Sequence, residues 1–301
     1  MSTSDVKTQF TKLFDNQVLS RLEQLRLNPH RRLTNRSRGE HLAAKGGTST
    51  EFADYRNYVE GDDVRYVDWN IFARLRRPFL KLYQHEEEMH VVLIVDASSS
   101  MEFEDKFLRA KQLAAAFAVL GVMNLERVSL YAFHQKEKAP ALLPPCTGRI
   151  SLRRIFEFLE NLESGGDSPL EQAVDAVLNR HRGRGIAILL SDFLTFGDLN
   201  RPFNRLFSAG LETFGVQILG PSELRPELTG DVRFVDSENS LTLDVSSAGD
   251  LLAIYHEHLF GMQEDLSQSC RKRGGRFVCV ESNLPIESIL FDQLCRKGWI
   301  R

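Results

Sequence analysis

Cysteine is scarce in this sequence, and its four cysteines form no metal or redox motif. They show neither CxxC spacing nor the spacing of a zinc site among 301 residues: Cys146, Cys270, Cys279 and Cys295. Scattered cysteines generally behave as small, buried hydrophobic residues. We therefore expect mostly buried, reduced thiols in a reducing compartment.

Long hydrophobic segments are also absent. The longest mostly apolar stretch covers residues 113–123, well short of the ~20 residues that a helix needs to cross a bilayer. The N-terminal sequence MSTSDVKTQF lacks the charged and then apolar layout of a signal peptide. These absences predict a cytoplasmic protein without a membrane span.

A strong net charge is missing as well. With 38 basic residues (Lys and Arg) against 41 acidic ones, the formal net charge is -3, which gives no overall attraction to nucleic acids or anionic membranes. Basic residues cluster at residues 26–38 and 74–81, but the first cluster has no interleaved aromatic residues for base stacking. We expect no nucleic-acid binding, and contact with an acidic partner surface instead.

Signatures of common enzyme classes are not found. The chain has no GxxxxGK[ST] phosphate loop, and Ser98 does not stand in a GxSxG turn. His256 and His258 are two residues apart on a predicted helix, so they do not share a face and cannot hold a metal together. The sequence favours a non-enzymatic protein.

Strand-like and helix-like segments alternate from residue 91 onward. Apolar runs rich in β-branched residues predict strands at residues 91–95, 128–133, 186–190, 213–219 and 276–280. Helical periodicity over residues 108–120 and 251–266 lies between them. This order predicts a doubly wound α/β fold, with a mostly parallel central sheet and helices on both faces.

The N-terminal part of the chain has a different pattern. Apolar residues at helical spacing predict an amphipathic helix within residues 5–27. An arginine-rich stretch and a glycine- and threonine-rich loop follow, both predicted to be irregular. We place these elements in an N-terminal region, residues 1–85, that packs against an α/β domain of residues 86–301.

Oxygen-bearing side chains follow two of the predicted strands: Asp96, Ser98 and Ser100 after one, and Asp192 after another. Open parallel sheets place ligand sites at the carboxyl ends of their strands. Hard oxygen ligands of low total charge suit a divalent cation that remains strongly electrophilic. These residues predict a Mg²⁺-type site, although Ser100 or Asp105 could instead cap the following helix in a metal-free arrangement.

A third segment, SGGDSPL at residues 164–170, could reach the same edge of the sheet. Its two glycines allow close backbone approach, and its proline suits the first turn of a helix that begins near Leu170. Ser168 is the natural N-cap of that helix.

These motifs resemble a known family. DASSS (96–100), GGDSPL (165–170) and LLSDF (189–193) are similar to the three pieces of a metal-ion-dependent adhesion site in von Willebrand factor type A domains. More closely, YRNYVEGDDVRYVDW (55–69) followed by FAR (72–74) resembles the domain-of-unknown-function family fifty-eight, whose members join such a segment to a type A-like domain. We call residues 55–74 the GDD/DW segment.

The resemblance implies a ligand role for the residues at the motif positions: Asp96, Ser98, Ser100, Ser168 and Asp192. Ser168 stands where the pattern has threonine, and the loop has an extra residue after its glycines, so Asp167 is an alternative ligand. The implied ion is Mg²⁺, or else Mn²⁺ or Ca²⁺. Its coordination would be completed by an acidic side chain of a partner, and the site could be empty without that partner.

The resemblance also implies a function and a partner class. Members of the family are proposed adaptors for MoxR-type AAA+ ATPases in the assembly or maturation of protein complexes. The expectation is thus a bacterial, non-enzymatic interaction module that binds such an ATPase, or a client protein with an exposed acidic residue.

Charged residues of the GDD/DW segment allow two interpretations. They could form a partner-binding site, or they could pair with each other and fix a turn, as opposite charges so close in sequence more often do: Asp62, Asp63, Arg65, Asp68 and Arg74. We favour the structural role. Trp69, Phe72 and Phe79 are expected to anchor the segment on the α/β domain.

The rival function is a metal-dependent phosphatase or nuclease. In that case Asp96 would be a nucleophile or a ligand, and Asp192 a second ligand. The aspartyl-phosphate pattern of dehalogenase-like enzymes requires a second aspartate two residues after the first, and Ser98 stands there.

Overall fold

The structure is a computed structural model that describes residues 9–28, 34–35, 50–86, 89–133, 140–166, 170–181, 183–194, 199–226, 232–235, 242–245 and 248–301. It divides into two units, one formed by residues 1–31 with 89–301 and the other by residues 32–88. No described helix is long and apolar enough to cross a membrane.

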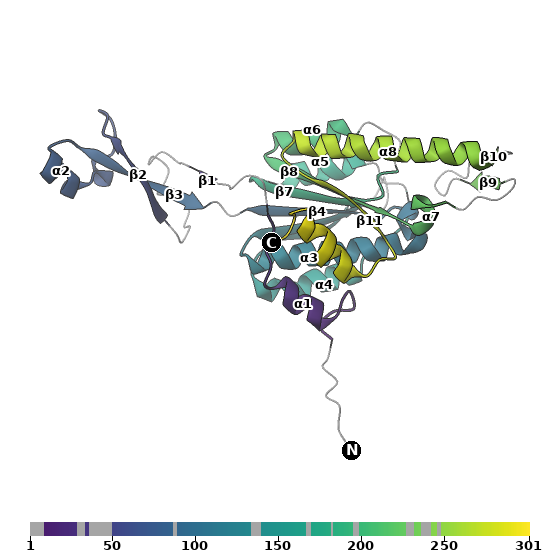
Figure 1. Cartoon of the computed structure of the whole chain (residues 1–301). Coiled ribbons are helices and arrows are strands. Elements are labelled where there is room, and N and C mark those ends of the chain that lie inside the picture. Colours follow the sequence, from purple (N-terminus) through teal and green to yellow (C-terminus); the bar gives the residue numbers. More distant parts are fainter. Residues whose placement is uncertain are drawn as a thin grey trace, which may run out of the picture. The chain divides into compact units, whose positions relative to one another are not determined.

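A six-stranded sheet with the order β11-β8-β7-β4-β5-β6 organises the larger unit (Figure 1). Its strands are β4 (His90–Asp96), β5 (Arg127–Phe133), β6 (Ala141–Cys146), β7 (Gly185–Ser191), β8 (Leu211–Leu219) and β11 (Phe277–Glu281). All neighbouring pairs are parallel except β5 and β6. The five predicted strands and the doubly wound α/β class are confirmed.

Strand β6 was not predicted, and its sequence explains why. It contains Pro144 and Pro145, which have no amide hydrogen to donate to a neighbouring strand. Such residues are tolerated at the edge of a sheet, and β6 is an edge strand.

Helices cover both faces of this sheet, as Figure 1 shows. One face carries α5 (Leu170–Arg180), α6 (Asn200–Ser208) and α8 (Ala248–Lys272); the other carries α1 (Asn16–Leu22), α3 (Lys106–Met123) and α4 (Leu152–Glu160). The short segments of this unit are η2 (Ser99–Asp105), η3 (Arg149–Ser151), α7 (Pro221–Leu224), the hairpin β9 (Val232–Val235) and β10 (Thr242–Val245), and the π-helical turn η4 (Ser288–Leu294). The helices predicted at residues 108–120 and 251–266 are therefore confirmed.

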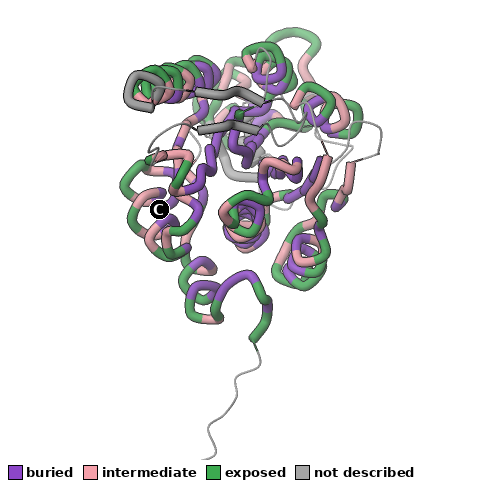
Figure 2. The backbone as a smooth tube through the Cα atoms, turned by 90° about the vertical axis from the view of Figure 1, so that its right-hand side faces the viewer, coloured by how far each residue is buried: buried purple, intermediate pink, exposed green. Residues whose placement is uncertain are grey.

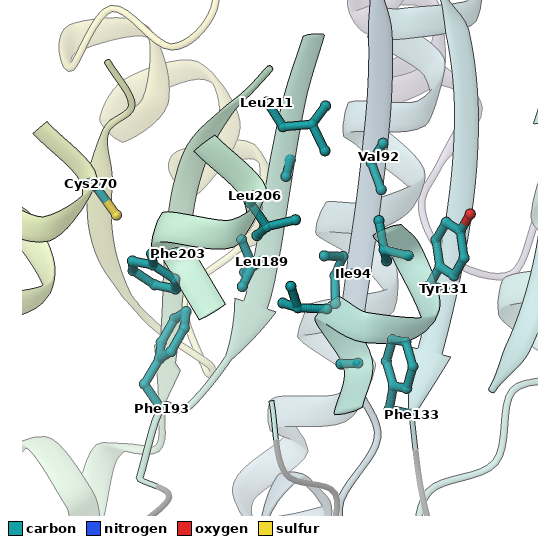
Figure 3. Close-up of a cluster of buried hydrophobic side chains, with 14 of the residues drawn as sticks. Val92, Ile94, Tyr131, Phe133, Leu189, Phe193, Phe203, Leu206, Leu211 and Cys270 are labelled. Carbon is teal, nitrogen blue, oxygen red and sulfur yellow. The ribbon is translucent and has the colours of Figure 1, made fainter. Parts of the chain in front are cut away.

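The core lies along the central strands, where the backbone in Figure 2 is coloured as buried. Every residue of β7 and β8 is buried, as expected for parallel strands with helices on both faces. On the α5 and α6 side, side chains of β4 and β7 pack against Phe203 and Leu206 (Figure 3). All four cysteines are free, but only Cys270 is fully buried.

The N-terminal helix is shorter than the sequence predicted. Residues 9–15 precede α1 as irregular chain, because the Glu160 carboxylate accepts hydrogen bonds from Thr11 Oγ1 at 2.6 Å and from the Lys12 amide at 2.8 Å. Phe10 and Phe14 pack edge-on against Phe156, so their helical spacing serves contacts with α4 instead. The structure groups this region with the α/β unit, whereas the sequence analysis placed it with the GDD/DW segment.

The smaller unit is a three-stranded antiparallel sheet with the order β1-β3-β2. It consists of β1 (Thr34–Asn35), β2 (Thr50–Asn57), the 3-10 turn η1 (Val64–Tyr66), α2 (Trp69–Leu75) and β3 (Phe79–Glu86). Most of the arginine-rich stretch, residues 29–33 and 36–38, lies outside the described residues.

Candidate functional site

The predicted site lies where the strand order reverses. From β4 the chain adds β5 and β6 on one side, and it then returns to add β7, β8 and β11 on the other side of β4. In open α/β sheets, ligands bind at the carboxyl ends of the two strands that flank such a point. Asp96 is the last residue of β4 and Ser191 is the last residue of β7.

Asp96 is held at this edge by neutral donors. Its Oδ2 accepts a hydrogen bond from Ser191 Oγ at 2.6 Å, and its Oδ1 accepts one from the Ser98 amide at 3.0 Å. Burial and the nearby charge of Asp192 raise the pKa of Asp96 above its ordinary value, although the serine hydrogen bonds lower it in part. Among the described residues, no lysine or arginine forms an ion pair with this carboxylate.

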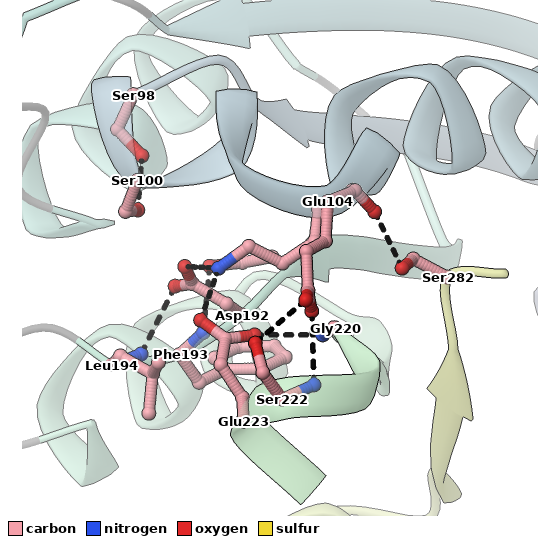
Figure 4. Close-up of polar contacts among 12 residues, drawn as sticks. Ser98, Ser100, Glu104, Asp192, Phe193, Leu194, Gly220, Ser222, Glu223 and Ser282 are labelled. Carbon is pink, nitrogen blue, oxygen red and sulfur yellow. Dashed lines mark hydrogen bonds and ion pairs between the residues drawn. The ribbon is translucent and has the colours of Figure 1, made fainter. Parts of the chain in front are cut away.

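The Ser98 hydroxyl lies near this carboxylate, and it contacts a second hydroxyl. Ser98 Oγ and Ser100 Oγ are 3.1 Å apart and face each other (Figure 4). Neither Ser98, before η2, nor Asp105, before α3, makes a side-chain capping bond to its helix. In the metal-free alternative, Ser100 or Asp105 would cap the helix. The structure does not support this role for Asp105, and the Ser100 hydroxyl contacts Ser98 Oγ.

The glycine loop is joined to the DASSS loop by three hydrogen bonds, two between backbone groups and one to a serine hydroxyl. The Ser99 amide donates to the Gly166 carbonyl at 2.9 Å, the Gly166 amide donates to Ser99 Oγ at 2.8 Å, and the Gly165 amide donates to the Ala97 carbonyl at 2.8 Å. Both glycines have positive φ values, 140° and 79°, which favour glycine at these positions. Asp167 and Ser168 follow directly but lie outside the described residues, so their ligand roles stay predictions.

Asp192 has a contact that the sequence analysis missed. Lys106 Nζ lies 2.9 Å from Asp192 Oδ2 and 2.6 Å from Glu223 Oε1, and the Lys106 side chain is only 1% exposed. Burial lowers the pKa of Lys106, but the two carboxylates more than offset this and hold its pKa above the ordinary value. Lys106 is therefore a charged, buried counter-ion of the Asp192 and Glu223 carboxylates, and both of these acids are labelled in Figure 4.

The charges at this edge of the sheet do not balance. Lys106 pairs with both Asp192 and Glu223, and the charge of Asp192 acts on the nearby Asp96, so these three acids and one lysine carry two net negative charges when all are ionised. No set of three or more His, Cys, Asp or Glu side chains that could hold a metal occurs among the described residues. The donor set at hand is one carboxylate and two hydroxyls, which suits a hard cation that takes further oxygen ligands from water or a partner.

The space beside Asp96 is small. A cavity of about 20 Å³ is lined by Asp96, Ser191 and apolar residues of β4, β7 and α5. That volume holds about one water molecule.

The charged residues of the GDD/DW segment pair locally. Arg56 makes two bonds to Asp62, at 2.6 and 2.7 Å, and Arg65 Nη2 lies 2.6 Å from Asp63 Oδ2. These are the kind of pairs that the structural interpretation predicts. Arg74 is exposed and has no ion pair among the described residues.

Asp68 connects α2 with the strands β2 and β3 of the smaller unit. Its Oδ2 accepts a hydrogen bond from the Tyr55 hydroxyl on β2 at 3.2 Å. Its Oδ1 accepts hydrogen bonds from the amides of Asn70 and Ile71 at the start of α2, and its Oδ2 lies 3.1 Å from Lys81 Nζ on β3. The Lys81 contact lowers the pKa of Asp68. By contrast, Trp69 and Phe72 are exposed on this unit, and the anchoring role expected for them and for Phe79 stays a prediction.

Comparison with known proteins places the chain in a family. The model of the protein family of unknown function DUF58 matches residues 54–258. The chain belongs to the DUF58 family. Uncharacterized DUF58-like relatives from Mycobacterium tuberculosis and Mycobacterium bovis are 30% identical over 239 residues, which cover 77% of this chain and 74% of theirs.

Solved structures similar to this DUF58 protein include two relevant examples. The conserved hypothetical protein BatB from Bacteroides thetaiotaomicron is 17% identical, with 69% of this chain and 98% of that chain covered and a TM-score of 0.43. Proximal thread matrix protein 1 from the mussel byssus, in a structure with a zinc-occupied MIDAS motif, is 11% identical, with 44% and 36% covered and a TM-score of 0.32. At these scores the similarity says nothing about what this DUF58 protein binds.

Proposed function

We propose that this DUF58 protein is a non-enzymatic interaction module that uses a divalent cation to bind an acidic side chain of a partner protein. Asp96, Ser98 and Ser100 would hold the ion, with Ser168 or Asp167 completing the protein's share of the ligands. The observation that carries the proposal is Asp96: a half-buried carboxylate, without a cationic partner among the described residues, that lies near the Ser98 hydroxyl, which in turn contacts Ser100 Oγ.

Lys106 would make this site selective for acidic partners. Lys106 already pairs with Asp192 and Glu223. The protein would therefore give the ion only one carboxylate ligand, Asp96, or two if Asp167 is also a ligand. A dication with so little ligand charge remains electrophilic and attracts a further carboxylate. Asp192 would then act on the ion at a distance, through its charge, rather than as a direct ligand.

From the family resemblance we propose Mg²⁺ as the ion, a cytoplasmic location, and a MoxR-type AAA+ ATPase or one of its client proteins as the partner.

Metal binding is tested by thermal unfolding of the wild type and of Asp96→Asn, with Mg²⁺ and with EDTA. At ten times its dissociation constant an ion stabilises the native state by about 1.4 kcal/mol, a shift of a few degrees or less at this size. We expect this shift in the wild type and in the surface control Glu157→Gln, and none in Asp96→Asn.

The same variant separates a metal site from a purely structural one. Burial raises the pKa of Asp96, so the ionised carboxylate costs stability when no ion is present. Asp96→Asn should therefore unfold at an equal or higher temperature than the wild type in EDTA. If Asp96→Asn is much less stable than the wild type in EDTA, and the wild type does not respond to Mg²⁺, the proposal is contradicted.

Partner binding is tested with the purified MoxR-type ATPase of the same bacterium. We expect a complex by calorimetry in Mg²⁺ that is lost in EDTA and with Asp96→Asn, and kept with Glu157→Gln. Binding that ignores EDTA would contradict a cation-bridged contact with this partner.

A further inference from the structure

Helix α2 presents its apolar side chains to solvent. None of its residues is buried, and Trp69, Phe72 and Leu75 are 59%, 39% and 62% exposed. These residues are three positions apart, so they lie along one side of the helix. The rings of Trp69 and Phe72 also contact each other edge-on, with centroids 5.9 Å apart, and we call the three side chains the apolar strip.

Polar contacts, not apolar burial, hold this helix in place. A helix of seven residues is not stable by propensity alone. Asp68, which is 6% exposed, caps two amides of the first turn and also binds Lys81 and the Tyr55 hydroxyl. Within the smaller unit, α2 is therefore fixed through its first turn, and the described residues of this unit leave the apolar strip exposed.

The end of α2 adds positive charge beside this strip. Arg74, Arg76 and Arg77 are exposed, and none of them forms an ion pair among the described residues. Three neighbouring acids of the segment are already paired, Asp62 with Arg56, Asp63 with Arg65, and Asp68 with Lys81, whereas Glu60 is exposed. The α2 surface, defined as Trp69, Phe72, Leu75, Arg74, Arg76 and Arg77, thus carries three positive charges that form no ion pair among the described residues.

We infer that the α2 surface is a docking site for an acidic, amphipathic segment of a partner protein. Tryptophan and arginine are the residue types most enriched in binding hot spots, and arginine guanidinium groups pair with carboxylates through two parallel hydrogen bonds. The occupant would place apolar side chains on the strip and carboxylates on the arginines. This site needs no metal ion, and it therefore stands apart from the proposed function of the Asp96 site.

Trp69 provides a reporter in the full-length protein. The chain has two tryptophans, and the other, Trp299, is buried at 2% exposure. We expect acrylamide to quench the tryptophan fluorescence of the wild type strongly and that of the Trp69→Phe variant weakly. Protection of Trp69 in the free protein would overturn the inference, because the surface would then be covered by the rest of the chain or by a second copy.

Binding is measured by Trp69 fluorescence with two synthetic helical peptides. Both carry leucine and phenylalanine along one side; one has glutamates along the other side and the second has lysines. We expect salt-sensitive, saturable binding of the glutamate peptide in EDTA, and with Asp96→Asn as with the wild type. Equal binding of both peptides, or no binding of the glutamate peptide, would overturn the inference.

Variants matched in charge and size test the location. The double variant Arg74→Gln with Arg77→Gln, and the variant Leu75→Ala, should each weaken binding by at least about tenfold. The controls on the larger unit, Arg153→Gln with Arg154→Gln, and Ile150→Ala, should leave it unchanged. If the control pair weakens binding as much as the test pair, or if only vesicles of anionic lipid respond to Arg74 and Arg77, the inference fails.

Discussion

Lys106 is the residue on which the charge balance of the Asp96 site depends. It is the first residue of α3, and it meets carboxylates from the end of β7 and from α7. Removing one partner of a buried ion pair leaves the other charge without compensation, which is costlier than replacing the whole pair.

We predict that Lys106→Met lowers the free energy of unfolding by about 3–5 kcal/mol. The variant leaves Asp192 and Glu223 without their cation in a largely buried position. Chemical denaturation measures the loss, and Lys111→Met on the same helix is the control, because Lys111 has no ion pair among the described residues. A loss below about 1 kcal/mol would show that water reaches and solvates these carboxylates.

His90 predicts a pH dependence at the other end of β4. Burial, with smaller contributions from His181 and Arg127, lowers the pKa of His90 from 6.5 to about 4. Its folded-state pKa is below the unfolded value, so the neutral ring favours folding above pH 6.5, and this stability is lost as the pH falls toward 4. The rings of His90 and His181 contact each other edge-on, with their centroids 5.0 Å apart.

The measurement is the melting temperature of the wild type and of His90→Phe across this pH window. The phenylalanine keeps a ring against His181 but cannot take up a proton, so the variant should lose less stability on acidification. Parallel curves for the two proteins would contradict the assignment to His90.

At the level of elements, the sequence predicted correctly those strands whose apolar runs have a single structural explanation. Strands β4, β7 and β8 are runs of apolar residues that are buried on both faces, and such runs predict interior strands directly. The N-terminal helix was predicted too long because Phe10 and Phe14 have helical spacing but contact Phe156 from irregular chain.

The polar part of the site was predicted in part only, for a physical reason. Asp96, Ser98 and Ser100 are close in sequence, so their proximity could be inferred. Lys106 meets partners that follow it by 86 and 117 positions. No local pattern indicates such contacts, and only the strand order brings them together.

Helix α2 gives a prediction about a whole element. Asp68→Ala should destabilise α2 by about 1–2 kcal/mol, because it removes the cap of the first turn, and it also removes the contact with Lys81. Asp68→Asn keeps an acceptor for the two amides but not the charge, and should cost less. Amide hydrogen exchange in residues 69–75 measures both effects; equal exchange in the two variants would show that the charge, and not the cap, holds the helix.

In the larger unit, the segment after α1 is joined to the last residues of the chain, and these residues reach the core. The Asn28 amide donates to the Trp299 carbonyl at 2.9 Å, and Arg26 and Arg301 exchange backbone hydrogen bonds at 2.8 and 3.0 Å. The Trp299 ring lies between Phe117 of α3 and Phe214 of β8, with centroids 6.0 and 5.0 Å away. The last residues of the chain therefore complete the core beneath α3.

The two tryptophans separate stability from recognition across the whole molecule. Trp299→Ala should cost about 3–5 kcal/mol of unfolding free energy, since it empties a closely packed aromatic site. Trp69→Ala removes a side chain that is 59% exposed, so its cost should stay within about 0.5 kcal/mol, while the acidic peptide should lose affinity. Denaturant titrations and peptide binding by calorimetry measure both quantities. A large stability loss in Trp69→Ala would mean that this ring belongs to the folded core in solution, because an exposed side chain contributes little to folding.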